Sequence, residues 1–276
     1  MNIIIADIDS IIVSLIELPT LVKLACVNKY FYQLVSEQLI VKQWSIIKNT
    51  GEKKKSINKI FTETCKNGFL LYAMHIIKQN KINIHTNRDY AFELSCLNGH
   101  SEMAHWLIQL GESEDYGKID IHINNEYAFR LSCHNGHSKI ANWLIQLGES
   151  KDYGKINIHS GSEYAFMRSC ENGHSQIANW LIQLGESQGY GKINIHSDSE
   201  YAFRWSCQNG HSQIANWLIQ LGESQNYGKI DIHSHNEHAF KWSRENGHSQ
   251  IAKWLIHLGE SQNYGKINIH RDGKHP

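Results

Sequence analysis

One stretch of this chain returns again and again at a fixed interval. Residues 200–233 read EYAFRWSCQNGHSQIANWLIQLGESQNYGKIDIH, and the tryptophan of this stretch recurs every 37 residues, at Trp106, Trp143, Trp180, Trp217 and Trp254. A fixed period of this size is typical of a repeat array, in which similar units stack in a row and each contacts only its neighbours. Neither a globular enzyme nor a membrane channel fits this pattern well.

Each unit of the array predicts two helices and an extended segment. In the unit 124–159, a first helix at 126–134 ends at an Asn-Gly pair, because both residues tolerate positive φ. A second helix at 138–147 carries apolar residues at helical spacing and stops at Gly148. The tail 153–159 alternates apolar and polar residues, as an extended segment beside a turn does.

The order helix, Gly turn, helix and extended finger is the layout of the ankyrin repeat. Asn-Gly-His occurs in five units, each time followed by an apolar second helix of the form IANWLIQLG. Residues 57–270 therefore resemble an ankyrin-repeat array, and the resemblance implies an all-α solenoid of helix-turn-helix units with extended fingers. Its six units are 57–85, 87–122, 124–159, 161–196, 198–233 and 235–270, followed by a tail at 271–276.

Two departures from the family pattern point to a particular branch of it. The Thr-Pro-Leu-His opening of the family is replaced by Tyr-Ala-Phe-Arg at Tyr127 to Arg130, and the period exceeds the usual value of about 33. This combination resembles the ankyrin families expanded in the large, mimivirus-like DNA viruses of amoebae. The replacement implies that the family's usual Thr and His hydrogen bonds between turns are lost, and we expect larger aromatic contacts in their place.

Residues 1–50 do not share the repeat and predict three short helices, separated from the array by a polar linker at 51–56. Their order resembles an F-box, although the Leu-Pro-x-Glu opening of that family is missing. The resemblance implies docking to the Skp-family adaptor of a cullin-type ubiquitin ligase through apolar positions of this segment. The alternative is a plain helical cap on the first repeat. The positions that the resemblance implies for docking are Leu18, Pro19, Leu21, Leu24, Val27 and Phe31.

Charge and hydropathy exclude several classes of partner. The 27 basic residues balance the 27 acidic residues, so no net field attracts nucleic acid or an anionic membrane surface. The apolar stretch 11–27 is interrupted by Glu17, Pro19 and Lys23, which is typical of neither a signal peptide nor a spanning helix. We expect a monomer in the cytoplasm, which is that of the host if the chain is viral, and a nuclear location stays open.

The sequence predicts no catalytic, cofactor or metal site. Eleven of the 18 histidines are periodic, and rungs one repeat apart lie too far from each other to share a zinc ion, so we expect them to make capping and turn hydrogen bonds. The local group His233, His235 and His238 predicts adventitious metal binding at most. Five cysteines occupy one equivalent position, where neighbouring helices stand too far apart for disulfides, and predict buried, reduced thiols: Cys65, Cys96, Cys133, Cys170 and Cys207.

Variation between units marks a candidate recognition face. Near-identical repeats differ at three first-helix positions and at the finger tips, which in the ankyrin family line the concave, partner-binding surface. Neutral drift at exposed sites is the alternative explanation. The candidate partner-binding residues are Arg130, Leu131, His134, Met167, Arg168, Glu171, Arg204, Trp205, Gln208, Lys241, Trp242 and Glu245.

Three hypotheses for function follow from these patterns. The first is a non-enzymatic module that binds a partner protein on the concave face, as the substrate receptor of a cullin-type ligase if the F-box-like segment docks an adaptor. The second is a stand-alone scaffold or competitive inhibitor of a host protein. A weaker third is an enzyme or metal protein that uses the histidines.

Overall fold

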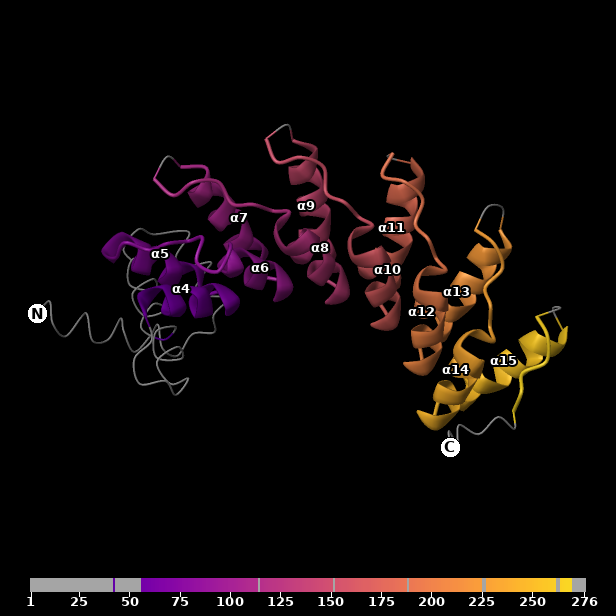
Figure 1. Cartoon of the computed structure of the whole chain (residues 1–276). Coiled ribbons are helices and arrows are strands. Elements are labelled where there is room, and N and C mark those ends of the chain that lie inside the picture. Colours follow the sequence, from indigo (N-terminus) through magenta and orange to yellow (C-terminus); the bar gives the residue numbers. More distant parts are fainter. Residues whose placement is uncertain are drawn as a thin grey trace, which may run out of the picture. The chain divides into compact units, whose positions relative to one another are not determined.

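The array of the chain is built from helix pairs. The computed structural model describes residue 42 and residues 56–269, except 114, 151, 188, 225, 226, 262 and 263. Over these residues six helix pairs follow one another along the chain (Figure 1). The predicted N-terminal helical domain, 1–50, lies outside the described residues except for Lys42, and so do all six of its proposed adaptor-docking positions.

The first helices of the six pairs begin after an extended segment or linker, and the second helices begin after a glycine turn or its equivalent. The first helices are α4 (Ile57–Lys66), α6 (Tyr90–Leu97), α8 (Ile123–His134), α10 (Ser160–Glu171), α12 (Ser197–Gln208) and α14 (Ser234–Glu245). The second helices are α5 (Leu70–Gln79), α7 (Ser101–Gly111), α9 (Ser138–Glu149), α11 (Ser175–Ser187), α13 (Ser212–Glu223) and α15 (Ser249–Ser261). The predicted all-helical repeat architecture is therefore confirmed for the described residues.

The chain divides into two compact units, 1–119 and 120–276. In the N-terminal unit α4 packs against α5 and α6, and α6 packs against α7. In the C-terminal unit the first helices α8, α10, α12 and α14 pack one against the next, and each also contacts its own second helix (Figure 1). The closest helix contacts between neighbouring repeats of this unit thus join first helices, which form one continuous face.

Aromatic residues join neighbouring repeats in the core. In the C-terminal unit the fully buried phenylalanines of α8, α10 and α12 each stand against a tryptophan three helices further on, in the second helix of the next repeat. The ring centroids lie 6.4 Å apart for Phe129 and Trp180 and 6.3 Å apart for Phe166 and Trp217. Trp180, Trp217 and Trp254 are therefore contacts between repeats, because each half-buried indole packs against a phenylalanine ring of the preceding repeat.

The cysteine ladder lies in the same core. All five repeated thiols are free, and each cysteine is 0% exposed. Burial raises the pKa of Cys133, Cys170 and Cys207 far above the ordinary value of a thiol, which keeps these side chains neutral. The predicted burial of the ladder is confirmed.

Three successive residues at each finger tip adopt a left-handed backbone. In α8 these residues are Asn124, Asn125 and Glu126, with φ of 52°, 61° and 60°. The right-handed part of the helix therefore runs from Tyr127, one residue after its predicted start. The other tips with the same turn are 87–89, 161–163, 198–200 and 235–237. Left-handed backbone is costly for residues other than glycine, at about 1–2 kcal/mol each, so contacts elsewhere must hold these turns.

Candidate functional site

The predicted partner-binding residues all lie on the first helices of the C-terminal unit. Leu131, Met167 and Arg204 are buried, with 8%, 7% and 5% of their surface exposed. The remaining nine positions of the predicted set reach solvent. Those nine are Arg130, His134, Arg168, Glu171, Trp205, Gln208, Lys241, Trp242 and Glu245.

Aromatic rings and guanidinium groups alternate along this face. The Arg130 guanidinium lies over the Tyr164 ring at 4.8 Å, and the Arg168 guanidinium lies between the rings of Tyr164 and Tyr201, at 5.2 and 4.8 Å. Cation–π contacts of this kind contribute roughly 0.5–1 kcal/mol each where the groups are exposed. They hold two long, flexible side chains in fixed positions on the surface.

The row continues as a stack of aromatic rings toward the last repeat. Tyr201 stacks on Trp205 at 5.4 Å, Trp205 contacts His238 at 5.8 Å, and His238 contacts Trp242 at 6.0 Å. Trp242 is 43% exposed, because α14 is the last first helix of the described array and no ring from a further repeat covers it. We call the whole row the ring strip, which comprises Tyr127, Arg130, Tyr164, Arg168, Tyr201, Trp205, His238 and Trp242.

The imidazole in the ring strip is uncharged at neutral pH. Burial lowers the pKa of His238 to about 4, and the positive charge of Arg204 adds to this effect. His134, which stacks on Tyr164 beside the strip at 6.1 Å, also has a lowered pKa, through burial and the nearby Arg168. Both rings therefore act as neutral aromatic surfaces. The positive charge of the ring strip comes from its arginines.

Two arginines of the predicted set also hold the left-handed turns. Arg204 donates from Nε to the carbonyl oxygen of Ser199 at 2.7 Å and from Nη2 to that of Asp198 at 2.9 Å. Arg130 makes the same pair of bonds to Asn125 and Asn124, at 2.7 and 3.0 Å. The sequence pattern predicted these arginines only as partner contacts, and their second role was not predicted.

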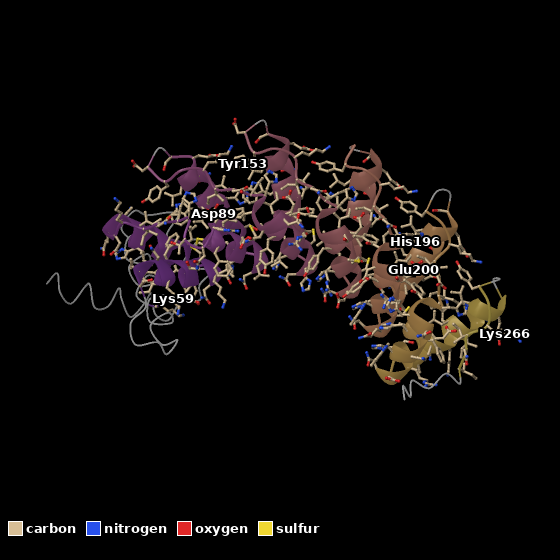
Figure 2. The ribbon with its side chains drawn as sticks, viewed as in Figure 1. Lys59, Asp89, Tyr153, His196, Glu200 and Lys266 are labelled. Carbon is tan, nitrogen blue, oxygen red and sulfur yellow. The ribbon has the colours of Figure 1, made fainter. Side chains whose placement is uncertain are left out.

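A second network, absent from the predicted site, joins each finger to the next. The histidine that ends a finger lies against the acid four residues later, with Nδ1 to carboxylate distances of 2.8 Å for His196 and Glu200 and 2.9 Å for His233 and Glu237. Figure 2 labels His196 and Glu200, which lie side by side. The other ring nitrogen, Nε2, lies against the backbone carbonyl of a tyrosine in the following repeat, 2.8 Å away for His196 and Tyr227.

The carboxylate of the same acid also contacts the following finger. The backbone N–H of Asp231 donates to Glu200 at 3.1 Å, and the N–H of Asn194 donates to Glu163 at the same distance. We call each such group a finger joint: a finger histidine, its acid and the backbone of the next finger. The five joints are centred on His85, His122, His159, His196 and His233.

The finger joints bear on two expectations from the sequence. The turn hydrogen bonds expected of the periodic histidines are confirmed for these five, while His270 lies outside the described residues. Hydrogen bonds between turns are nevertheless present, because the histidine and acid of each joint, which lie outside the replaced Tyr-Ala-Phe-Arg positions, link one turn to the next. The sequence did hold the signal: a histidine and an acid recur four residues apart in five successive repeats.

The histidine groups do not form a metal site within the described part of the chain. No three His, Cys, Asp or Glu side chains there lie close enough together to hold an ion. His233, in the group that the sequence singled out, has both ring nitrogens engaged, with Glu237 and with the carbonyl of Tyr264. Separately, none of the described helices is long and apolar enough to span a bilayer.

Comparison with known proteins bears on the fold. A family model for ankyrin repeats in three copies matches residues 92–190 and 166–266. No curated protein matches the chain.

Similar solved structures include two ankyrin domains and one complex. The human ASB11 ankyrin repeat domain is 18% identical, with 72% of this chain and 83% of that one covered and a TM-score of 0.47. An ankyrin repeat family protein from Legionella pneumophila is 17% identical, with 78% and 73% covered and a TM-score of 0.41. The third is from a complex of the predatory endopeptidase Bd0816 of Bdellovibrio bacteriovorus with the immunity protein Bd3460, 18% identical, with 73% and 98% covered and a TM-score of 0.46.

Ankyrin repeats are in general protein-binding modules without catalytic activity. The family match spans more than half of the chain and covers most of α6 and all of the helices from α7 to α15. The chain belongs to the ankyrin-repeat proteins.

Proposed function

We propose that this protein binds a partner protein on the first-helix face of its C-terminal unit, with the ring strip at the centre of the contact. The observation that carries the proposal is the uninterrupted row of Tyr, Trp and Arg side chains across four first helices. Tyr, Trp and Arg are the residues that most often dominate the energetics of protein interfaces, because they bury large areas and combine apolar contact with hydrogen bonding. Exposed Trp242 is the side chain best placed to enter a pocket on the partner.

The proposal uses the predicted residues unequally. Leu131, Met167 and Arg204 are buried and support the face from below. Around the strip, Glu171, Gln208, Lys241 and Glu245 supply the polar groups that a rim requires. The resemblance to arrays of amoebal giant viruses favours a host protein as the partner.

The test replaces Trp242 with alanine and compares it with a matched control. Ile269→Ala removes an apolar side chain that is 44% exposed, against 43% for Trp242, but lies on a finger away from the strip. We expect Trp242→Ala to weaken binding of the captured partner at least about tenfold and Ile269→Ala to leave it unchanged. Equal loss of binding in both variants, or loss in neither, would contradict a contact centred on the strip.

Crosslinking from this face identifies the partner directly. A photo-crosslinking residue at position 242 is expected to capture one host protein that the same residue at Gln250, exposed on α15, does not capture. The double change Trp205→Ala and Trp242→Ala is expected to abolish this capture, while the helical circular-dichroism signal persists. Loss of that signal would show that the two indoles act as core, and the face would then be misassigned.

The finer role depends on residues 1–50. We propose that the array presents its partner to a cullin-type ubiquitin ligase, and the support for this step is the F-box-like order of the N-terminal segment alone. The competing role is a stand-alone scaffold or competitive inhibitor. A pulldown with purified Skp-family adaptor separates them: binding that Leu24→Asp abolishes supports the ligase role, whereas no binding, or binding that this change leaves intact, supports the scaffold.

A further inference from the structure

The finger joints give each finger histidine two hydrogen-bond acceptors and no donor. Around His196, Nδ1 lies 2.8 Å from a carboxylate oxygen of Glu200, and Nε2 lies 2.8 Å from the carbonyl oxygen of Tyr227. An ionised carboxylate and a backbone carbonyl can only accept. Both ring nitrogens can be satisfied only if both carry hydrogen, which makes the ring an imidazolium cation.

The same requirement holds in all five joints. The distances from Nε2 to the next tyrosine carbonyl are 2.8, 2.8, 2.9, 2.8 and 2.9 Å, and each Nδ1 faces its acid. The acids are nearly buried, with 6–9% of their side chains exposed. A buried carboxylate needs a positive partner, so histidine and acid depend on each other.

We propose that the finger joints form a protonation-controlled lock on the array. With the proton in place, each joint ties a left-handed finger tip to its own histidine and ties that histidine to the next repeat. A neutral imidazole keeps a single N–H, so loss of the proton turns a lone pair either toward the carboxylate or toward the tyrosine carbonyl. One of the two bonds becomes a repulsion, and either the tip or the connection between repeats is released.

The charges around each joint favour the protonated form. Burial alone lowers the pKa of His196, but the bonds to Glu200 and to the Tyr227 carbonyl, with the charge of Glu200, raise that pKa above its ordinary value of 6.5. The other four finger histidines are raised in the same way, and the carboxylates of Asp120 and Asp231 add to the effect at His122 and His233. At the joint of His196, the positive charge that opposes protonation is Arg204, whose guanidinium also interacts with Glu200.

The lysines of the fingers engage tyrosine rings. Lys155 and Lys192 lie over the rings of Tyr190 and Tyr227, at 3.7 and 3.8 Å, and so hold their ammonium groups on a neighbouring finger's aromatic face.

The sign of the pH effect follows from these shifts. A histidine with a raised pKa in the folded state stabilises that state fully below its unfolded pKa, and the stabilisation is lost as pH rises through the folded pKa. We therefore expect the array to be more stable to unfolding in mildly acidic solution than in mildly alkaline solution. The histidines with lowered pKa, His134, His174 and His238, oppose this trend only below pH 6.5, because they are neutral in both states above it.

The first measurement is an NMR titration of the imidazole nitrogens in the whole chain, with signals assigned by single His→Gln variants. We expect the five finger histidines to retain both ring hydrogens at a pH where an exposed histidine is already neutral. A single neutral tautomer for these rings at about pH 6.5 would overturn the proposal.

The second measurement is urea denaturation at about pH 6 and about pH 9. We expect a lower midpoint at the higher pH, and we expect Glu200→Gln to reduce this pH dependence, because the neutral amide no longer holds the proton on His196. The matched control is Glu186→Gln. Glu186 is an exposed acid whose hydrogen bond, at 2.7 Å, comes from the Tyr227 hydroxyl and not from a finger histidine. An unchanged pH dependence in Glu200→Gln, with equal destabilisation at both pH values, would leave the joint a structural contact and overturn the lock.

Discussion

At the scale of single residues, the glycine of each Asn-Gly-His turn offers a sharp test of how repeats interlock. Gly210 and Gly247 occupy equivalent positions and have φ of 83° and 84°. A Cβ on Gly210 would lie 2.6 Å from the ring of His248 in the next repeat, whereas a Cβ on Gly247 would meet nothing within 4 Å. The two sites therefore share the backbone strain and differ in the histidine seated above.

We expect both Gly→Ala variants to lose stability and Gly210→Ala to lose more. The positive φ costs an alanine about 1–2 kcal/mol at either site, and displacing His248 adds about 1–3 kcal/mol at Gly210 alone. Urea denaturation of the two variants at one pH measures the difference. Equal losses of stability would show that His248 moves aside freely and that its contact with Gly210 contributes nothing to stability.

The Asn-Gly-His turn was predictable from the sequence only in its local conformation. The Asn-Gly pair was correctly predicted to reverse the chain, because positive φ is a local property of glycine. The contact of His248 with Gly210 joins residues 38 positions apart, and no local rule of sequence predicts it. The finger histidines lie between these cases: their turn hydrogen bonds were predicted, but the partner acid and the tyrosine carbonyl were not.

At the scale of elements, the paired helices follow from the periodic pattern, but the finger tips do not. Apolar spacing predicted the helix pair, but the predicted stop at Gly148 is wrong, because α9 continues through this glycine to Glu149. The left-handed triplets escaped prediction because they consist mostly of residues other than glycine, held there by side chains from the following helix. Arg204 is the clearest example, since it bonds the carbonyls of Ser199 and Asp198.

We expect Arg204→Met to destabilise the array by about 1–3 kcal/mol, the usual contribution of hydrogen bonds made by a charged donor. Methionine is the natural residue at the equivalent position, Met167, and there the turn begins with Gly161, which adopts φ of 68° without strain. Asp198→Gly in the Arg204→Met background is therefore expected to restore about 1 kcal/mol. Thermal denaturation of the single and double variants is the measurement.

Lys241→Met is the control for the arginine clamp. Lys241 occupies the equivalent position in the last repeat, and a single ammonium cannot match the fork with which a guanidinium spans two carbonyls. This change is expected to cost less than Arg204→Met. An equal cost in both, or no rescue by Asp198→Gly, would show that the loss at Arg204 comes from packing on the aromatic face.

At the scale of the whole molecule, a repeat array is stabilised by its units and by the contacts between neighbours, so its ends open more easily than its middle. Family and architecture were predictable because the 37-residue periodicity extends over most of the array and does not depend on any single residue. The ring strip was predicted only as scattered variable positions, since its continuity arises when helices far apart in sequence pack side by side. Cys170 and Cys207 can serve as probes of whether neighbouring repeats open together, because both thiols are fully buried in adjacent repeats of one unit.

We expect a thiol reagent to modify Cys207 faster than Cys170 under native conditions. Both thiols are 0% exposed and have pKa values raised by burial, so each reacts only when its surroundings open. Cys207 lies one repeat closer to α14, the last first helix of the described array, where Trp242 is uncovered, and fraying from α14 exposes it first. Mass spectrometry of the adducts over time measures the two rates. Identical rates, equal to the rate of global unfolding, would mean that the repeats of this unit open as one block, and the finger joints would then couple neighbouring repeats more tightly than a nearest-neighbour array allows.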